Sequence, residues 1–267
     1  MDMFLNEGVF TNINTIDGTH EGTHEGTHEG THEGTHEGTY EGLSDVQEYT
    51  YEGTILEPTL YDVTGIGEIA VIGNPYEWGE VLDDCQGDNI YKFGGDCGLV
   101  SVANILTMAG IEVTEDEVVG RAIDLNLCVY SEFNAPEDNG GTTAMDRADL
   151  LRSYGINCTI VEDKDGAGSL DNLAELVENG YGVNISINAG YAWNEASAVG
   201  DGMSNHSIIV TGTARDPETG ELIGLYVCDS GLTDCESGAM LLTVDNLRDC
   251  YLDVPGTAAV ITNEEIR

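Results

Sequence analysis

The residue most able to perform nucleophilic chemistry is Cys97, in the segment GDCGLVSVANILTMAG (95–110). Apolar residues with helical spacing follow this cysteine, so the pattern predicts a helix over 97–109 that ends before Gly110. A thiol at a helix N-terminus lies beside unpaired N–H groups and the positive end of the helix dipole, which favour the thiolate. The alternative is a buried cysteine on an amphipathic helix, which is a common structural role.

A histidine and an aspartate are predicted to lie side by side further along the chain. His206 starts the predicted strand HSIIVTG (206–212), and Asp229 lies near the end of ELIGLYVCDSG (221–231). The turn DPETG between these segments predicts a β-hairpin, in which the start of one strand faces the end of the other. The pair could therefore be a general base and the carboxylate that orients it. A structural histidine and a turn aspartate are the alternatives.

Three further residues have more ambiguous patterns. Gln86, in DDCQGDN, lies 11 residues before Cys97, and its amide could donate a hydrogen bond to a developing oxyanion. The backbone N–H of Cys97 would be the second donor, whereas a polar loop residue is the simpler interpretation of Gln86. Asp96 is expected to be a turn or cap residue. Trp193, in GYAWNE, could line a cleft or belong to the core.

The order Gln86, Cys97, His206 and Asp229 resembles that of papain-like cysteine peptidases, specifically the peptidase C39-like group. The shared motifs are DCG at the start of a central helix, NHSIIVTG on a strand, and an apolar strand ending in DSG, together spanning roughly residues 84–231. The resemblance implies Cys97 as nucleophile, His206 as base, Asp229 as its orienting residue and Gln86 as oxyanion donor. It implies hydrolysis of a peptide or isopeptide bond through a thioester, without a cofactor. The spacing from Gln86 to Cys97 is longer than this family usually shows.

The amino-terminal region has a different composition. Residues 18–37 are five copies of GTHE, followed by the variant GTYE at 38–41. Glycine at every fourth position opposes a helix, and a period of four does not fit a strand. We therefore expect residues 1–65 to form a mostly disordered acidic arm and residues 66–267 to form the peptidase-like domain. The repeat could bind divalent metal through its histidines, although a linker without any site is the simpler interpretation.

The segments outside this arm predict an α+β fold, because helices come first and strands second. Capping patterns predict helices beginning after Thr114, Thr143 and Ser169. The first of these should run to about Leu127. A short helix is expected over 245–250. The expected strands are 66–75 (a strand and turn), 182–190, 206–212, 221–231, 239–244 and 257–262.

The net charge of the protein limits the kinds of molecule that it can bind. Fifty Asp and Glu residues stand against eight Lys and Arg, a formal net charge of −42, which excludes nucleic-acid backbones and disfavours anionic membranes. Residues 1–75 carry 15 of the acids and no base, so the remainder is itself acidic. We expect a peptide or protein substrate that is neutral or basic.

The sequence shows no signal peptide and no apolar run long enough to span a membrane, which predicts a cytoplasmic or non-classically exported protein. Seven cysteines with scattered spacing predict reduced thiols and no structural metal site. Two other classes stay open: a non-catalytic binding or adhesion module on a degenerate peptidase fold, and a metal-binding protein centred on the His-Glu repeat.

Overall fold

The structure is a computed structural model, and it describes residues 57–63, 65–82, 85–231 and 239–267. The GTHE repeat lies outside these residues, and so do the expected disordered arm and its metal site. No helix in the described ranges is long and apolar enough to cross a membrane.

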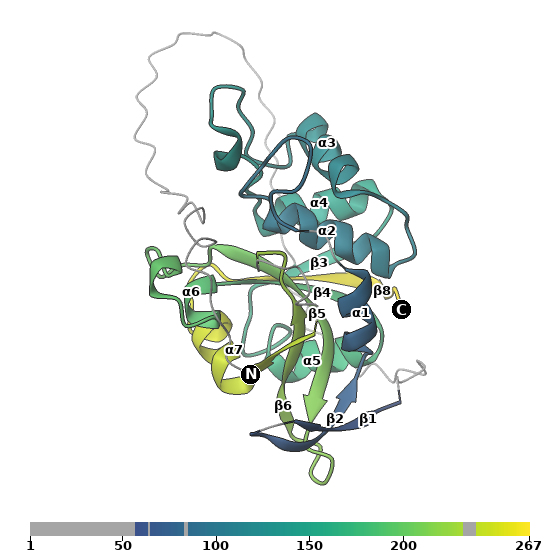
Figure 1. Ribbon diagram of the computed structural model, residues 1–267. Helices are drawn as coiled ribbons and strands as arrows, with labels where there is room; N and C mark the ends of the chain where they lie inside the picture. Colours follow the sequence, from purple (N-terminus) through teal and green to yellow (C-terminus); the bar gives the residue numbers. More distant parts are fainter. Residues whose placement is uncertain (1–56, 64, 83–84, 232–238) are drawn as a thin grey trace, which may run out of the picture. The chain divides into compact units, whose positions relative to one another are not determined.

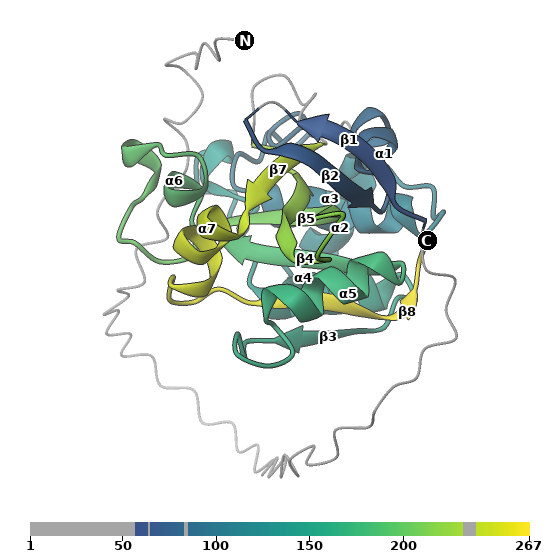
Figure 2. The ribbon, with the colours of Figure 1, turned by 90° about the horizontal axis from the view of Figure 1, so that it is seen from below.

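The described residues form an antiparallel sheet of eight strands (Figures 1 and 2). Six of them follow the order β1-β2-β5-β4-β8-β3, while β6 pairs with β5 and β7 pairs with β6. The long strand β5 is therefore the centre of the sheet, with partners on both sides. The strands are β1 (Thr59–Val63), β2 (Gly67–Ile72), β3 (Cys158–Val161), β4 (Tyr181–Ile187), β5 (His206–Arg215), β6 (Leu222–Cys228), β7 (Met240–Thr243) and β8 (Ala259–Glu265).

Helices cover both faces of this sheet. Because the sheet is antiparallel, the predicted α+β class is confirmed. Figure 1 shows α2, α3 and α4 on one side of β4 and β8, with α5 on the other. The helices are α1 (Pro75–Val81), α2 (Cys97–Met108), α3 (Glu115–Leu125), α4 (Ala144–Ser153), α5 (Leu170–Glu178), α6 (Ala189–Ala192) and α7 (Val244–Leu247), with short turns η2 (Pro136–Asp138), η3 (Ala196–Ala198) and η4 (Arg248–Leu252).

Side-chain alternation along the central strand explains the two-faced core. Ile208 and Val210 of β5 belong to the hydrophobic cluster that includes α5. Ile209, between them, belongs to the cluster that includes α2, α3 and α4. Successive residues of a strand point to opposite faces. β5 is therefore buried on both sides, which fixes the position of His206 at its start.

The predicted helix starts agree with the structure. Thr114 and Glu117 form a reciprocal capping box at the start of α3, and Thr143 caps α4 in the same way with Asp146. Ser169 accepts a hydrogen bond from the Asn172 backbone N–H at the start of α5. The helix α3 ends before Leu127 because Asn126 has a left-handed conformation, with φ of 54°.

Several elements differ from the sequence-based expectation. The sheet begins at Thr59, within the range assigned to the arm, because β1 pairs along its whole length with β2. The helix α1 and the strand β3 were not predicted. α1 is short and lacks an apolar period, and β3 has only four residues, so neither gives a strong pattern.

The expectation of reduced thiols is correct for most described cysteines and wrong for one. Cys97, Cys128, Cys158 and Cys250 are free. Cys85 is disulfide-bonded. Sequence spacing does not show which cysteines the fold brings together, which is why this bond was missed.

Candidate active site

The thiol of Cys97 lies at the first residue of α2, as the sequence predicts, and is partly exposed. The helix is anchored by Leu99 and Val100, which are fully buried. The glycines before it allow close backbone approach. A side chain at Gly95 would place its Cβ 3.0 Å from the Asn139 carbonyl oxygen. The fold thus presents this sulfur at a helix N-terminus, next to tightly packed loop backbone.

His206 and Asp229 are in direct contact. The His206 Nε2 lies 2.6 Å from Asp229 Oδ1, and both side chains are buried. The β5–β6 register, which pairs Ile209 with Cys228, brings the start of one strand beside the residue that follows the other. The predicted hairpin and this juxtaposition are therefore correct.

Asp229 also accepts hydrogen bonds from two other groups. Trp193 Nε1 donates to Oδ2 at 2.8 Å, and the Gly231 backbone N–H donates to Oδ1 at 2.7 Å. The sequence left Trp193 open between cleft and core, and the structure assigns its indole N–H to this carboxylate. These donors and His206 stabilise the carboxylate form of Asp229. Burial alone would raise the pKa of Asp229, and the His206 charge and these hydrogen bonds lower it.

Cys97 and His206 also interact. Burial disfavours the charged form of both groups. The hydrogen bond and the Coulomb attraction between them outweigh this effect, and for His206 the charge of Asp229 contributes as well. The pKa of Cys97 is lowered as a result, and the pKa of His206 is raised well above its ordinary value. The backbone of Ser207 adds a further hydrogen bond to the sulfur. Both shifts favour the thiolate–imidazolium pair over the neutral pair.

Gln86 lies in the loop that leads to this group. Its backbone N–H donates to the Ser230 carbonyl at 3.0 Å, next to Asp229. Its side-chain amide donates to the carbonyl of Gly94, three residues before Cys97. The structure therefore brings Gln86 to the same end of the molecule, where the hydrogen bond of its amide is made to the loop and not to the sulfur.

Asp96 stands at the N-cap position of α2 but does not cap it with its side chain. Instead, it accepts hydrogen bonds from the Gly87 backbone N–H at 3.1 Å and Asn89 Nδ2 at 2.8 Å. Asn89 also donates to Glu115 Oε1 at 3.0 Å, which ties the loop to α3. Burial, then the hydrogen bond and charge of Glu115, raise the pKa of Asp96 far above its ordinary value. The neutral form of the Asp96 carboxyl group is therefore favoured.

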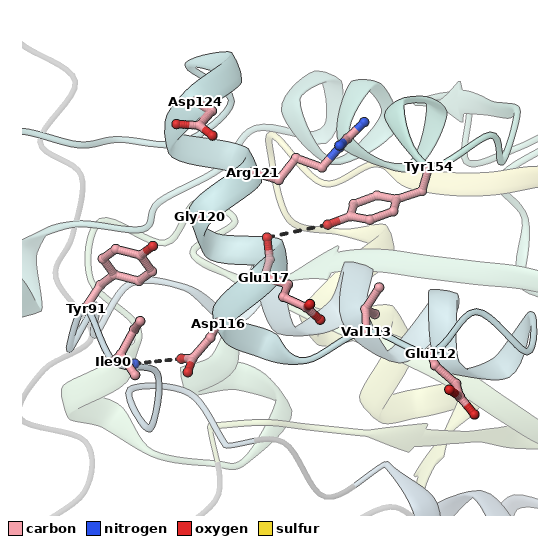
Figure 3. A pocket seen from close by; sticks show the side chains of 10 residues that line it. All are labelled: Ile90, Tyr91, Glu112, Val113, Asp116, Glu117, Gly120, Arg121, Asp124 and Tyr154. Atoms are coloured by element: carbon pink, nitrogen blue, oxygen red, sulfur yellow. Dashed lines mark hydrogen bonds between the residues drawn. The ribbon is translucent and has the colours of Figure 1, made fainter.

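A cavity of about 590 Å³ lies away from these residues, on the outer side of α3 (Figure 3). It is lined by the carboxylates of Glu112, Asp116, Glu117 and Asp124, together with Arg121 and Tyr154. Cys97 is not part of its lining. Among the described residues, no group of three or more His, Cys, Asp or Glu side chains could hold a metal ion.

Comparisons with known proteins give a distant structural likeness. No protein-family model and no curated protein matches the sequence. One solved structure with a similar arrangement is a double glycine motif protease from an AMS/PCAT transporter, crystallised in complex with the leader peptide. It is 15% identical, with a TM-score of 0.38, and the match covers 63% of this chain and 84% of that one.

Proposed function

We propose that this protein is a cysteine peptidase or amidase with a papain-like, C39-like arrangement. The proposal is carried by one observation: His206, whose charge acts against burial to lower the pKa of Cys97, lies 2.6 Å from Asp229. A nucleophile, a base and an orienting carboxylate in this order are the parts that covalent hydrolysis of an amide requires. A binding module would need none of the three.

In the proposed reaction, the Cys97 thiolate attacks the carbonyl carbon of the substrate amide. The negative charge that develops on oxygen is stabilised by the Cys97 backbone N–H, at a helix start where such groups have no partner within the helix. Gln86 is proposed as the second donor, with the amide N–H that remains beside its bond to Gly94. His206 gives its proton to the leaving amine, and the C–N bond breaks to leave a thioester.

Water then completes the cycle. His206, now neutral, takes a proton from water as the oxygen adds to the thioester carbon. The C–S bond breaks, the carboxylic acid product leaves, and the sulfur returns as a thiolate. Asp229 stabilises the imidazolium form of His206 in both halves of the reaction and holds the ring through Nε2. The substrate class is a peptide or isopeptide, and the net charge of −42 favours neutral or basic substrates.

Alkylation by iodoacetamide across pH, followed by peptide mapping, tests this proposal. We expect Cys97 to react faster than Cys128, Cys158 and Cys250 at about pH 6, because its pKa is lowered and theirs are raised. Burial raises the pKa of Cys128 to about 11 and that of Cys250 to about 12, so these thiols serve as internal references.

Two variants decide the outcome. His206→Ala should abolish the advantage of Cys97 and the hydrolysis of a fluorogenic peptide library, whereas His20→Ala in the repeat should change neither. Equal labelling of all cysteines in the wild-type protein would contradict the proposed function.

A further inference from the structure

A buried arginine lies next to the first turn of α2 and takes no part in the proposed reaction. Arg147, in α4, is only 4% exposed. Burial of a guanidinium is costly unless its charge is compensated. The sequence does not predict the burial of Arg147, because arginine in the first turns of a helix is ordinarily exposed.

The hydrogen bonds of Arg147 are all to neutral groups. Its Nε donates to Asn184 Oδ1 at 2.8 Å, and its Nη2 donates to Ser186 Oγ at 2.5 Å. Nη1 lies 3.4 Å from the carbonyl and hydroxyl oxygens of Thr142. No carboxylate in the described part of the chain forms an ion pair with this guanidinium. Asp146, its neighbour in sequence, is instead bonded to Thr143 at the helix cap.

The position of Arg147 is set by the helix that carries Cys97. A Cβ at Gly98 would lie 3.0 Å from Arg147 Cδ and 2.0 Å from Thr142 Oγ1. Only glycine at this second position of α2 lets the arginine stem pass so close to the first turn. Two negative charges act on the buried guanidinium, and that of the Cys97 sulfur has a larger effect than that of Asp146.

The acceptors of Arg147 belong to a buried network that extends to Cys97. Asn184, which accepts from Nε, donates to Ser207 Oγ at 2.8 Å. Ser207 Oγ donates to Ser101 Oγ at 3.2 Å, and the Ser207 backbone hydrogen-bonds to Cys97. The network thus links α4, β4, β5 and α2 around one atom, so the guanidinium is fixed with respect to the thiol.

We propose that Arg147 is a positioning residue of this site, whose fixed positive charge acts together with that of His206 to hold the Cys97 sulfur as a thiolate. This inference rests on the proposed function and deepens it. His206 loses its charge when it protonates the leaving amine, whereas Arg147 keeps its proton throughout. The charge of Arg147 therefore also favours release of the thiolate when the thioester C–S bond breaks.

The lowered pKa of Cys97 agrees with this role, because the Arg147 charge contributes to it after burial and the two interactions with His206. The reverse effect is also present. Burial lowers the pKa of Arg147 to about 10, while the charge of Cys97 raises it. At that value the guanidinium keeps its proton at neutral pH.

The test is the pH profile of Cys97 alkylation in the full-length protein. Arg147→Gln removes the charge and keeps amide N–H donors for Asn184 and Ser186. We expect its thiol pKa to rise by about one unit, so that alkylation near pH 6 becomes roughly tenfold slower. Arg147→Lys keeps the charge and should recover most of the wild-type rate. Arg152→Gln, on the same helix but paired with Asp149, is the matched control and should react as the wild type does.

The outcomes separate the two proposals. An unchanged profile in folded Arg147→Gln, or equal losses in the Gln and Lys variants, overturns the role of Arg147. A shifted profile without any amide hydrolysis supports Arg147 and contradicts the proposed function. An ordinary thiol pKa in the wild type contradicts both.

If circular dichroism shows that Arg147→Gln is unfolded, Asn184→Asp replaces it. This substitution preserves volume and places a carboxylate on Arg147 Nε, so the thiol pKa should rise because the guanidinium charge is neutralised. An unchanged pKa in Asn184→Asp likewise overturns the proposal.

Discussion

Two buried aspartates flank the candidate site and have opposite charge states. Asp96 and Asp229 are at most 1% exposed, and each accepts hydrogen bonds from backbone and side-chain N–H groups. Nevertheless, the pKa of Asp96 is raised and that of Asp229 is lowered. Burial pushes both upward, so the direction is decided by the partner: an acid, Glu115, in one case and a base, His206, in the other.

The two carboxyl groups therefore have different roles. Asp229 is a stable anion that holds an imidazolium. Asp96 is a neutral hydrogen-bonding group that fastens the loop of Gly87 and Asn89 to α3 through Glu115. A neutral Asp96 also spares the adjacent Cys97 thiolate from a like charge, since ionised Asp96 and Cys97 repel each other.

The largest expected effect comes from removing the partner of Asp229. His206→Ala leaves a buried carboxylate without its cation, and we expect a loss of about 3 kcal/mol in the free energy of unfolding at pH 7. Burial should then raise the pKa of Asp229, so the stability of this variant should increase as the pH falls toward 4. Urea unfolding at pH 5 and pH 7 measures both effects.

The double variant His206→Ala/Asp229→Asn is the control for this prediction. It contains no uncompensated charge and should recover much of the lost stability. If the double variant is no more stable than His206→Ala, the loss does not arise from the charge of Asp229.

An intermediate effect is expected from converting the other aspartate into an anion. In the wild type, the raised pKa of Asp96 means that its contribution to stability is complete below its unfolded value of 3.8 and is lost as the pH rises. Glu115→Gln removes the neighbouring negative charge and supplies an amide donor, which favours ionisation of Asp96. We expect this variant to be more stable than the wild type by about 1–2 kcal/mol at pH 8, with a flatter pH dependence.

The same variant should make Cys97 less reactive, because ionised Asp96 raises the pKa of the neighbouring thiol. Thermal unfolding from pH 5 to pH 9 and the alkylation rate of Cys97 measure the two effects. Glu112→Gln, an exposed residue nearby, should leave both unchanged. A wild-type pH dependence in Glu115→Gln would show that Glu115 does not raise the pKa of Asp96.

The smallest effect is expected at Trp193. Trp193→Phe preserves the ring and removes the N–H that donates to Asp229 Oδ2 at 2.8 Å. We expect a loss of about 1 kcal/mol in unfolding free energy, because one of several hydrogen bonds to a buried anion is lost. The thiol profile should move only slightly. A loss as large as that of His206→Ala would mean that the indole, and not the imidazolium, is the main partner of Asp229.

The sequence alone predicts the elements that have strong local patterns. The capping residues Thr114, Thr143 and Ser169 were recognisable because their side chains act on backbone only three residues away. The juxtaposition of His206 and Asp229 was predictable for a related reason, since one tight hairpin fixes it.

The remaining contacts depend on long-range packing and could not be predicted. Arg147 meets Asn184 and Ser186 only because α4 packs near β4 in the folded protein. Glu115 looks like an ordinary acidic first-turn residue, and only the folded structure reveals that it helps burial to raise the pKa of Asp96. The pairing of β1 with β2 is local, but β1 is almost entirely exposed and gives no buried apolar pattern.

The serine contact between α2 and β5 has a consequence for the order of folding. Ser101 Oγ donates to the Ser207 carbonyl at 3.2 Å across 106 residues of sequence. A contact of such long range closes a large loop and forms late compared with helices and hairpins. The reactive thiol therefore reaches its activating neighbours only when most of the chain has been synthesised and folded, so a partly made chain carries Cys97 as an ordinary cysteine.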